Sequence, residues 1–157
     1  MVRLNNIEDC FRQGLLRRVE PSLTKSKESI AEAREWLSEA KKNVVVEAYK
    51  SAISSLYLAI FHSARAVLFR DGVREKSHYC VGVYLEKYVE QGVLEEDWVL
   101  IFDRMRSVRH TDQYSFQMRP SKEEVESGID IAGKFVNRME KLLNESGTAE
   151  KGIYETS

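Results

Sequence analysis

One stretch of the chain, residues 51–69, restricts the possible folds more than any other. Its sequence, SAISSLYLAIFHSARAVLF, holds a single formal charge, at Arg65. The stretch is long enough to cross a membrane, but four serines and His62 are spread along it, and polar side chains are costly in lipid. A helix that is apolar on most sides is also typical of the buried centre of a helical bundle. We therefore predict a long buried central helix and no membrane span.

The rest of the chain also has helical periodicity. Apolar residues recur at helical spacing, no run alternates with period two, and both prolines, Pro21 and Pro120, lie outside residues 22–119. We predict an all-α fold, an up-and-down helical bundle of about five to six helices. The expected helices cover residues 6–18, 23–42, 45–70, 77–91, 94–114 and 122–144.

Capping signals place several helix ends. Asn6 is a candidate N-cap, Gly72 a left-handed C-cap, and Ser121 with Glu124 has the spacing of a capping box. The helix over residues 6–18 is expected to end at Pro21. The predicted organisation is an N-terminal helical extension over residues 1–21, a bundle over 22–145 and a flexible C-terminal tail over 146–157.

Composition limits the kinds of partner and site. The 157 residues fit one domain, and 24 Lys and Arg against 25 Asp and Glu give a net charge of −1. Any contact with RNA or DNA is therefore expected to be a local patch. Cys10 and Cys80 lie in no CxxC and no Cys/His cluster, which favours a reducing, cytoplasmic location and argues against a disulfide scaffold or a metal site. The glycines match no phosphate-loop pattern, so no cofactor is expected.

The predicted fifth helix ends in an arginine-rich segment, RMRSVRHTDQYSFQMR, residues 104–119. At about 100° per residue, one arc of this helix gathers Arg106, Arg109, His110 and Gln113, with Tyr114 at its edge. Arginine suits phosphate binding, and His110 has the chemistry to transfer protons near neutral pH. Two readings stay open: the arginines bind an anion, or they pair with acidic residues of the chain such as Asp103.

Residues 55–89, SLYLAIFHSARAVLFRDGVREKSHYCVGVYLEKYV, resemble the HEPN superfamily of prokaryotic helical-bundle proteins. The residues that match its central helix, turn and next helix start are Tyr57, Ala59, Phe61, His62, Ala64, Arg65, Ala66, Gly72, Lys76, Ser77 and His78. The family's Arg-Asn-x-x-Asp-Tyr-like helix end has a counterpart in Arg109 to Tyr114, and its Ser/Thr-x-Glu-Glu start has one in residues 121–124. The resemblance covers about residues 25–143.

The resemblance implies a homodimeric bundle. Many HEPN proteins partner a minimal nucleotidyltransferase in toxin–antitoxin pairs, and others are metal-independent endoribonucleases with an Arg and a following His at the dimer interface. Here Tyr114 fills the His position counted from Arg109, and a tyrosine is a poor base at neutral pH. Arg104 and His110 have the required separation but lie about 120° apart on a helix.

We therefore favour a dimeric binding or assembly module without catalytic activity. It would partner a nucleotidyltransferase, or bind RNA or a nucleotide through Arg106, Arg109, His110 and Tyr114. The alternative is a toxin-type, metal-independent endoribonuclease in which His110 acts with Arg104 or Arg109 on a ribose 2′-OH and the adjacent phosphate.

Overall fold

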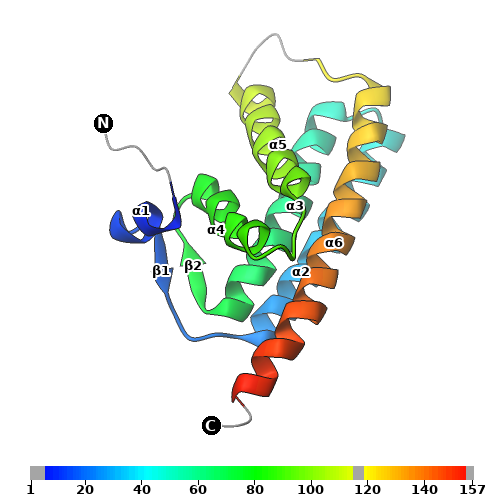
Figure 1. Ribbon diagram of the computed structural model, residues 1–157. Coiled ribbons are helices and arrows are strands. Elements are labelled where there is room, and N and C mark those ends of the chain that lie inside the picture. Colours follow the sequence, from blue (N-terminus) through cyan, green and yellow to red (C-terminus); the bar gives the residue numbers. More distant parts are fainter. Residues whose placement is uncertain (1–5, 115–118, 155–157) are drawn as a thin grey trace.

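Six helices and a two-stranded ribbon make up the part of the chain that the structure, a computed structural model, describes: residues 6–114 and 119–154 (Figure 1). At Asp112, Gln113 and 146–154 it describes the backbone alone. In chain order the elements are α1 (Ile7–Arg12), β1 (Leu16–Arg18), α2 (Leu23–Val45), α3 (Tyr49–Asp71), β2 (Val73–Glu75), α4 (His78–Glu90), α5 (Glu96–Tyr114) and α6 (Lys122–Tyr154).

α3 lies at the centre of the bundle, where α2, α4, α5 and α6 all contact it. Tyr57 and Ile60 are fully buried and Ile53 is 5% exposed. Burial of each such large apolar side chain stabilises the fold by about 1.5–3 kcal/mol. The predictions of an all-α bundle and of a long buried central helix are confirmed.

α3 is also the helix that is long and apolar enough to cross a bilayer, judged by length and composition over the described residues. In this fold 78% of its most apolar stretch is buried inside the protein. Its hydrophobicity is therefore used for packing against the neighbouring helices.

Three helix ends follow the capping signals of the sequence. Asn6 Oδ1 accepts a hydrogen bond from the Asp9 amide (2.9 Å), and Ser121 Oγ accepts one from the Glu124 amide (3.1 Å). The Glu124 carboxylate accepts in return from the Ser121 amide (3.4 Å), which completes the capping box. α3 ends at Gly72 in the left-handed conformation, with φ 74° and ψ 44°.

The N-terminal segment corrects the prediction of a helix over residues 6–18. α1 ends at Arg12, and Gly14 turns the chain at φ 72°. The chain then forms β1, which pairs antiparallel with β2, because this ribbon buries Leu16 (1% exposed) and Val73 (0%). Pro21 therefore lies between β1 and α2 and does not end a helix.

Gly72 also permits a close approach between the ribbon and the end of α3. Its carbonyl accepts a hydrogen bond from the Val19 amide (2.9 Å). A Cβ at this position would lie 2.6 Å from the Val19 carbonyl oxygen, well inside contact distance. Glycine is thus required both by the positive φ and by the chain segment that follows β1.

The two cysteines correct a second expectation. Cys10 on α1 and Cys80 on α4 form a disulfide, with Cα atoms 6.0 Å apart, although they are separated by 70 positions in sequence. Both side chains are fully buried, because α1 packs against α4. The bond joins the N-terminal segment covalently to the bundle.

α6 differs from the predicted helix over 122–144 at its C-terminal end. Its backbone remains helical through Tyr154, beyond the predicted end at residue 144, and residues 155–157 lie outside the described part. The apolar seam of α6 packs inside the bundle, where Val125, Ala132, Val136 and Met139 are fully buried. The division into extension, bundle and tail stays a prediction.

A buried charged network ties the end of α3 to α4 and α6. Arg70 Nε donates to Asp71 Oδ1 (2.8 Å), and the hydroxyls of Tyr84 (2.7 Å) and Tyr88 donate to Asp71 Oδ2. Arg70 Nη1 also donates to the Leu142 carbonyl of α6 (3.4 Å). Burial, followed by Asp71, raises the pKa of Tyr84, so its hydroxyl stays a donor.

We predict that Asp71→Asn lowers the free energy of unfolding by about 3–5 kcal/mol, because it leaves the Arg70 guanidinium buried without its anion. Asp130→Asn makes the same chemical change in an exposed pair with Lys134 (3.0 Å) and should cost less than about 1 kcal/mol. Urea denaturation of both variants measures the difference. Equal losses would show that the buried pair is not a structural anchor.

Candidate functional site

The packing of α5 determines how its polar side chains are presented. Val99, Phe102 and Met105 are buried against the rest of the bundle, and α5 contacts α3 and α4. Apolar residues at helical spacing form a seam on this face, which is buried at Leu94 and Met105 and partly buried at Trp98, Ile101 and Val108. Arg106 and Arg109 lie beside this packed face and are partly exposed.

Arg109 points toward the buried aromatic face of α3. Its guanidinium carbon lies 5.4 Å from the centroid of the Tyr57 ring, a cation–π contact that holds the side chain in place. Among the described residues, no carboxylate lies within ion-pair distance of Arg109. The guanidinium therefore has a fixed position but no anionic partner in that part of the chain.

Arg106 lies one turn earlier and is only loosely paired. Its Nε is 3.9 Å from Asp103 Oδ1, and neither atom has a hydrogen-bond partner among the described residues. Its guanidinium carbon lies 5.4 Å from the centroid of the Tyr79 ring on α4. Burial raises the pKa of Asp103, while Arg106 lowers it, which weakens this carboxylate as a partner at mildly acid pH.

The structure adds Tyr57 and His78 to the residues that the sequence placed in the site. A hydrogen bond joins the Tyr57 hydroxyl to His78 Nδ1 (2.8 Å), and the His78 ring stacks on Phe61 with centroids 4.1 Å apart. Burial raises the pKa of Tyr57, and burial followed by Arg109 lowers the pKa of His78. Both groups are therefore neutral at pH 7. Their membership of the family-like block of residues 55–89 was the one indication in the sequence.

Among the described residues, Arg104, His110 and Tyr114 make no side-chain contact with Arg109. Arg104, His110 and Tyr114 are exposed, and the His110 ring contacts the Tyr114 ring with centroids 4.8 Å apart. Within one chain, the structure shows no contact of His110 with Arg104 or Arg109 among the described residues. The Gln113 side chain, predicted on the same arc, lies outside the described residues.

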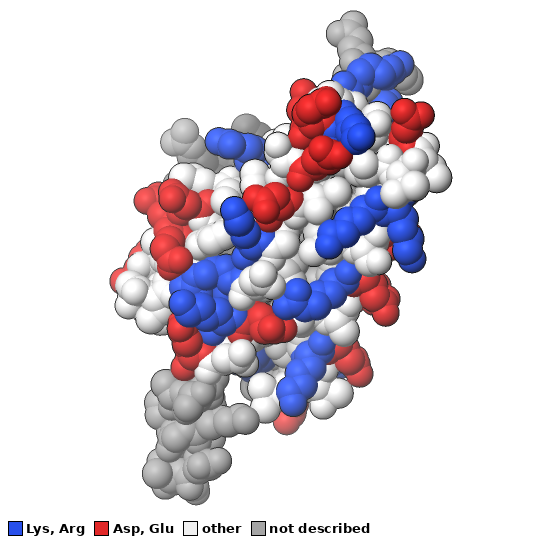
Figure 2. All heavy atoms as spheres, turned by 90° about the vertical axis from the view of Figure 1, so that its right-hand side faces the viewer, with Lys and Arg blue, Asp and Glu red and all other residues white. Residues whose placement is uncertain are grey.

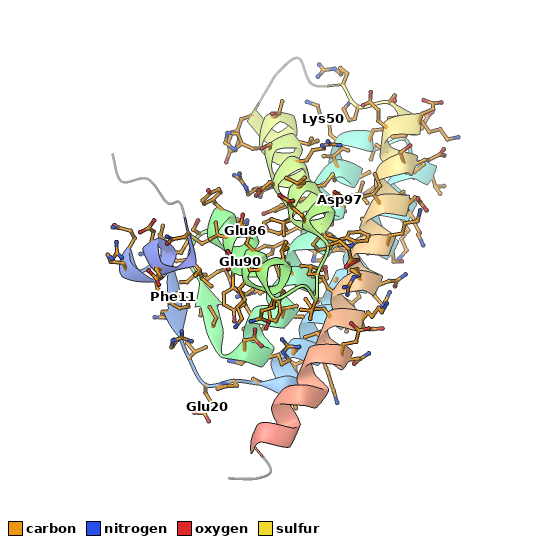
Figure 3. The ribbon with its side chains drawn as sticks, viewed as in Figure 1. Phe11, Glu20, Lys50, Glu86, Glu90 and Asp97 are labelled. Carbon is orange, nitrogen blue, oxygen red and sulfur yellow. A yellow bond between two sulfur atoms is a disulfide. The ribbon has the colours of Figure 1, made fainter. Side chains whose placement is uncertain are left out.

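Charge is distributed differently elsewhere on the surface. Figure 2 shows the face lined by α6, where Lys and Arg alternate with Asp and Glu. Many of these are ion pairs, such as Lys134–Asp130 (3.0 Å) and Arg138–Glu95 (2.9 Å). Figure 3 places Glu86 and Glu90 on α4 and Asp97 at the start of α5, away from the C-terminal half of α5. The arginines near the end of α5 thus stand out as weakly neutralised cations.

No group of three or more His, Cys, Asp or Glu side chains suited to a metal ion is present among the described residues. The available functional groups are guanidinium donors, two neutral aromatic partners and one exposed imidazole. Such a set can hold an anion by charge-assisted hydrogen bonds.

Comparison with known proteins finds a matching family and related sequences. Residues 26–142 match the family model of the HEPN domain. A protein of Methanocaldococcus jannaschii that carries the name "putative toxin" is 36% identical over 117 residues, which are 72% of this chain and 84% of the relative. A UPF0332 protein of Thermotoga maritima is 29% identical over 114 residues, 72% of this chain and 86% of the relative.

We predict that the stability of the protein falls as the pH drops below about 6.5, the ordinary pKa of histidine. The lowered pKa keeps folded His78 neutral, so the unfolded state binds more protons between the folded pKa and 6.5. Urea denaturation at several pH values between about 5 and 7 should show the free energy of unfolding falling as the pH falls. His78→Gln, which keeps a hydrogen-bonding partner for Tyr57, should reduce this slope and leave the part due to His62, whose pKa burial also lowers. An unchanged slope would contradict the assignment.

Proposed function

Because this chain belongs to the HEPN domain family, we propose that it is a HEPN binding module whose arginine cluster holds phosphate groups of RNA or of a nucleotide. The arginine cluster consists of Arg106, Arg109, His110 and Tyr114 on α5. The observation that carries the proposal is Arg109, a guanidinium fixed on the Tyr57 ring without a carboxylate partner in the described structure.

Carboxylates of the described residues neutralise the arginines near the end of α5 only in part. Arg106 has one loose carboxylate contact, at 3.9 Å, and Arg109 has none among the described residues. Clustered cations repel one another unless a nearby anion neutralises their charge. Phosphate fits this role because a guanidinium offers it planar, bidentate hydrogen bonds. The ring contacts of both arginines reduce the side-chain entropy that binding would cost.

The same geometry favours binding over catalysis. The His78 imidazole contacts the Tyr57 ring that Arg109 also contacts, but its Nδ1 is hydrogen-bonded to the Tyr57 hydroxyl and its pKa is lowered by burial. Tyr114, which takes the family's His position relative to Arg109, is 66% exposed. Neither group is arranged as a general base beside Arg109.

Assembly is the second part of the proposal. We infer a homodimer, with a minimal nucleotidyltransferase as a further protein partner. Leu100 on α5 (55% exposed) and Ile131 on α6 (37%) offer apolar surface for such contacts. A cytoplasmic location remains a prediction, and the Cys10–Cys80 disulfide counts against it, since disulfides are rare in reducing compartments.

One finding favours the alternative function. The relative from Methanocaldococcus jannaschii is named a toxin, which fits a toxin-type endoribonuclease. In that mechanism His110 accepts the proton of a ribose 2′-OH, and Arg109 or Arg104 stabilises the charge on the phosphate. Because His110 is exposed and does not contact these arginines in its own chain, the pair would have to meet across two subunits.

We predict that Arg109→Gln weakens binding of a single-stranded oligouridylate by about fivefold at 0.1 M salt. One lost phosphate contact should also reduce the slope of log K against log salt by about 0.7. Arg34→Gln is the matched control, because Arg34 is already paired with Glu140 (3.3 Å) on another face. Fluorescence anisotropy measures both variants, and equal behaviour of the two would refute the site.

The alternative is tested by RNA cleavage in the presence of a metal chelator. Our proposal predicts no cleavage above background by the wild-type protein. Cleavage by the wild type that is lost in His110→Ala would instead establish the endoribonuclease. Circular dichroism of His110→Ala confirms folding, and little change is expected because the side chain is exposed.

A further inference from the structure

A second group of cations surrounds one phenylalanine at the far end of α3. The Phe69 ring centroid lies 4.8 Å from the guanidinium carbon of Arg65, 5.9 Å from Lys25 Nζ and 6.0 Å from the guanidinium carbon of Arg74. These three residues come from α2, α3 and β2, so the fold itself brings them together. Neither Lys25 nor Arg74 belongs to the arginine cluster of α5.

The ribbon adds a fourth cation. Arg17 of β1 is directly opposite Arg74 of β2 in the antiparallel register, so the two side chains lie on the same face of the ribbon. Like charges directly opposite one another destabilise a strand pair. We call Lys25, Arg65 and Arg74, which contact Phe69, together with Arg17, which lies opposite Arg74, the ribbon patch.

Among the described residues, carboxylates form an ion pair with only one of the four cations of the ribbon patch. Arg65 Nε pairs with Glu75 Oε1 (2.8 Å), but Arg17, Lys25 and Arg74 form no ion pair within the described residues. The carboxylate nearest to β1 in sequence, Glu20, lies on the connection to α2 and projects away from the bundle in Figure 3. The ribbon patch therefore has cations positioned by an aromatic ring and no internal anion for three of them.

The ribbon patch and the arginine cluster contact α3 at positions twelve residues apart. Tyr57, Phe61, Arg65 and Phe69 follow one another at four-residue spacing, and each step turns about 40° around the helix, so Tyr57 and Phe69 lie about 120° apart around its axis. Arg109 contacts Tyr57 at one end, and Lys25 and Arg74 contact Phe69 at the other. The twelve-residue rise between the ends is about 18 Å.

We propose that the ribbon patch binds the phosphate backbone of a single-stranded nucleic acid that continues from the arginine cluster. The continuation rests on the proposed function, whereas the ribbon patch stands on its own contacts. A single strand fits because the two groups of cations lie about 18 Å apart along α3 and about 120° apart around it, and a flexible single strand can follow this bend whereas a stiff duplex cannot. A mononucleotide is too short to reach both ends, and exposed apolar side chains for insertion into a membrane are limited here to Val19 and Leu23.

Part of this surface lies outside the residues that match the HEPN domain, since Arg17 and Lys25 precede residue 26. The N-terminal segment thus supplies cations that the matched region lacks. The buried Leu16 and Val73 and the Cys10–Cys80 disulfide hold this segment in place.

The test compares the double variant Arg17→Gln/Arg74→Gln with the wild-type protein in binding an oligouridylate of about 12 nucleotides. Two lost phosphate contacts should weaken binding by about 25-fold at 0.1 M salt and lower the salt slope by about 1.4. Lys134→Gln/Lys141→Gln removes the same net charge from α6 and is the control, expected to leave the slope unchanged. Binding of a dinucleotide should not respond to the ribbon variant.

The outcomes separate this inference from the proposed function. If only Arg109→Gln weakens binding and the ribbon variant equals the α6 control, the ribbon patch is refuted and the arginine cluster stands. If only the ribbon variant weakens it, the ribbon patch stands and the arginine cluster fails. Binding to vesicles of phosphatidylserine that depends on Arg17 and Arg74, without binding to RNA, would overturn the nucleic-acid assignment in favour of a lipid surface.

Discussion

The burial of α3 is the constraint on which the rest of the structure depends. A helix that is apolar on nearly every side requires neighbours on nearly every side, and α2, α4, α5 and α6 supply them. Its half-exposed edge consists of Leu58, His62, Arg65 and Phe69. Cations from the neighbouring elements contact this edge and the adjoining Tyr57: Lys25 and Arg74 lie over Phe69, and Arg109 lies over Tyr57. The packing of the core therefore also determines where these cations lie on the surface.

This arrangement explains how a chain with a net charge of −1 can offer a strongly basic site. On the α6 face, cations and anions alternate and neutralise one another in pairs. Along α3, by contrast, aromatic rings position Arg109 and Arg74 without an anion from the described residues. An aromatic ring orients a guanidinium and leaves its N–H donors available. A guanidinium held in this way can bind a phosphate with little further loss of side-chain freedom.

Much of the fold could be predicted because its determinants are local in sequence. The apolar run of α3, the glycine after it and the Ser121–Glu124 capping box each act within a few residues. The ribbon could not be predicted, since each strand is three residues long and its register depends on a partner far along the chain. The Cys10–Cys80 pair and the contact of Tyr57 with His78 are similarly non-local. Sequence therefore located Arg106 and Arg109 but missed the aromatic partners that orient them.

The most direct test of the central claim is an NMR titration that follows the arginine Nε–Hε signals as a single-stranded oligouridylate is added at low salt. We expect the signals of Arg109 and Arg74 to shift together, because one strand contacts both the arginine cluster and the ribbon patch. The signal of Arg34, which hydrogen-bonds to Asn137 (3.2 Å) on another face, should stay in place. Shifts confined to Arg34, or no shift at Arg109 and Arg74 at saturating oligonucleotide, would contradict the account.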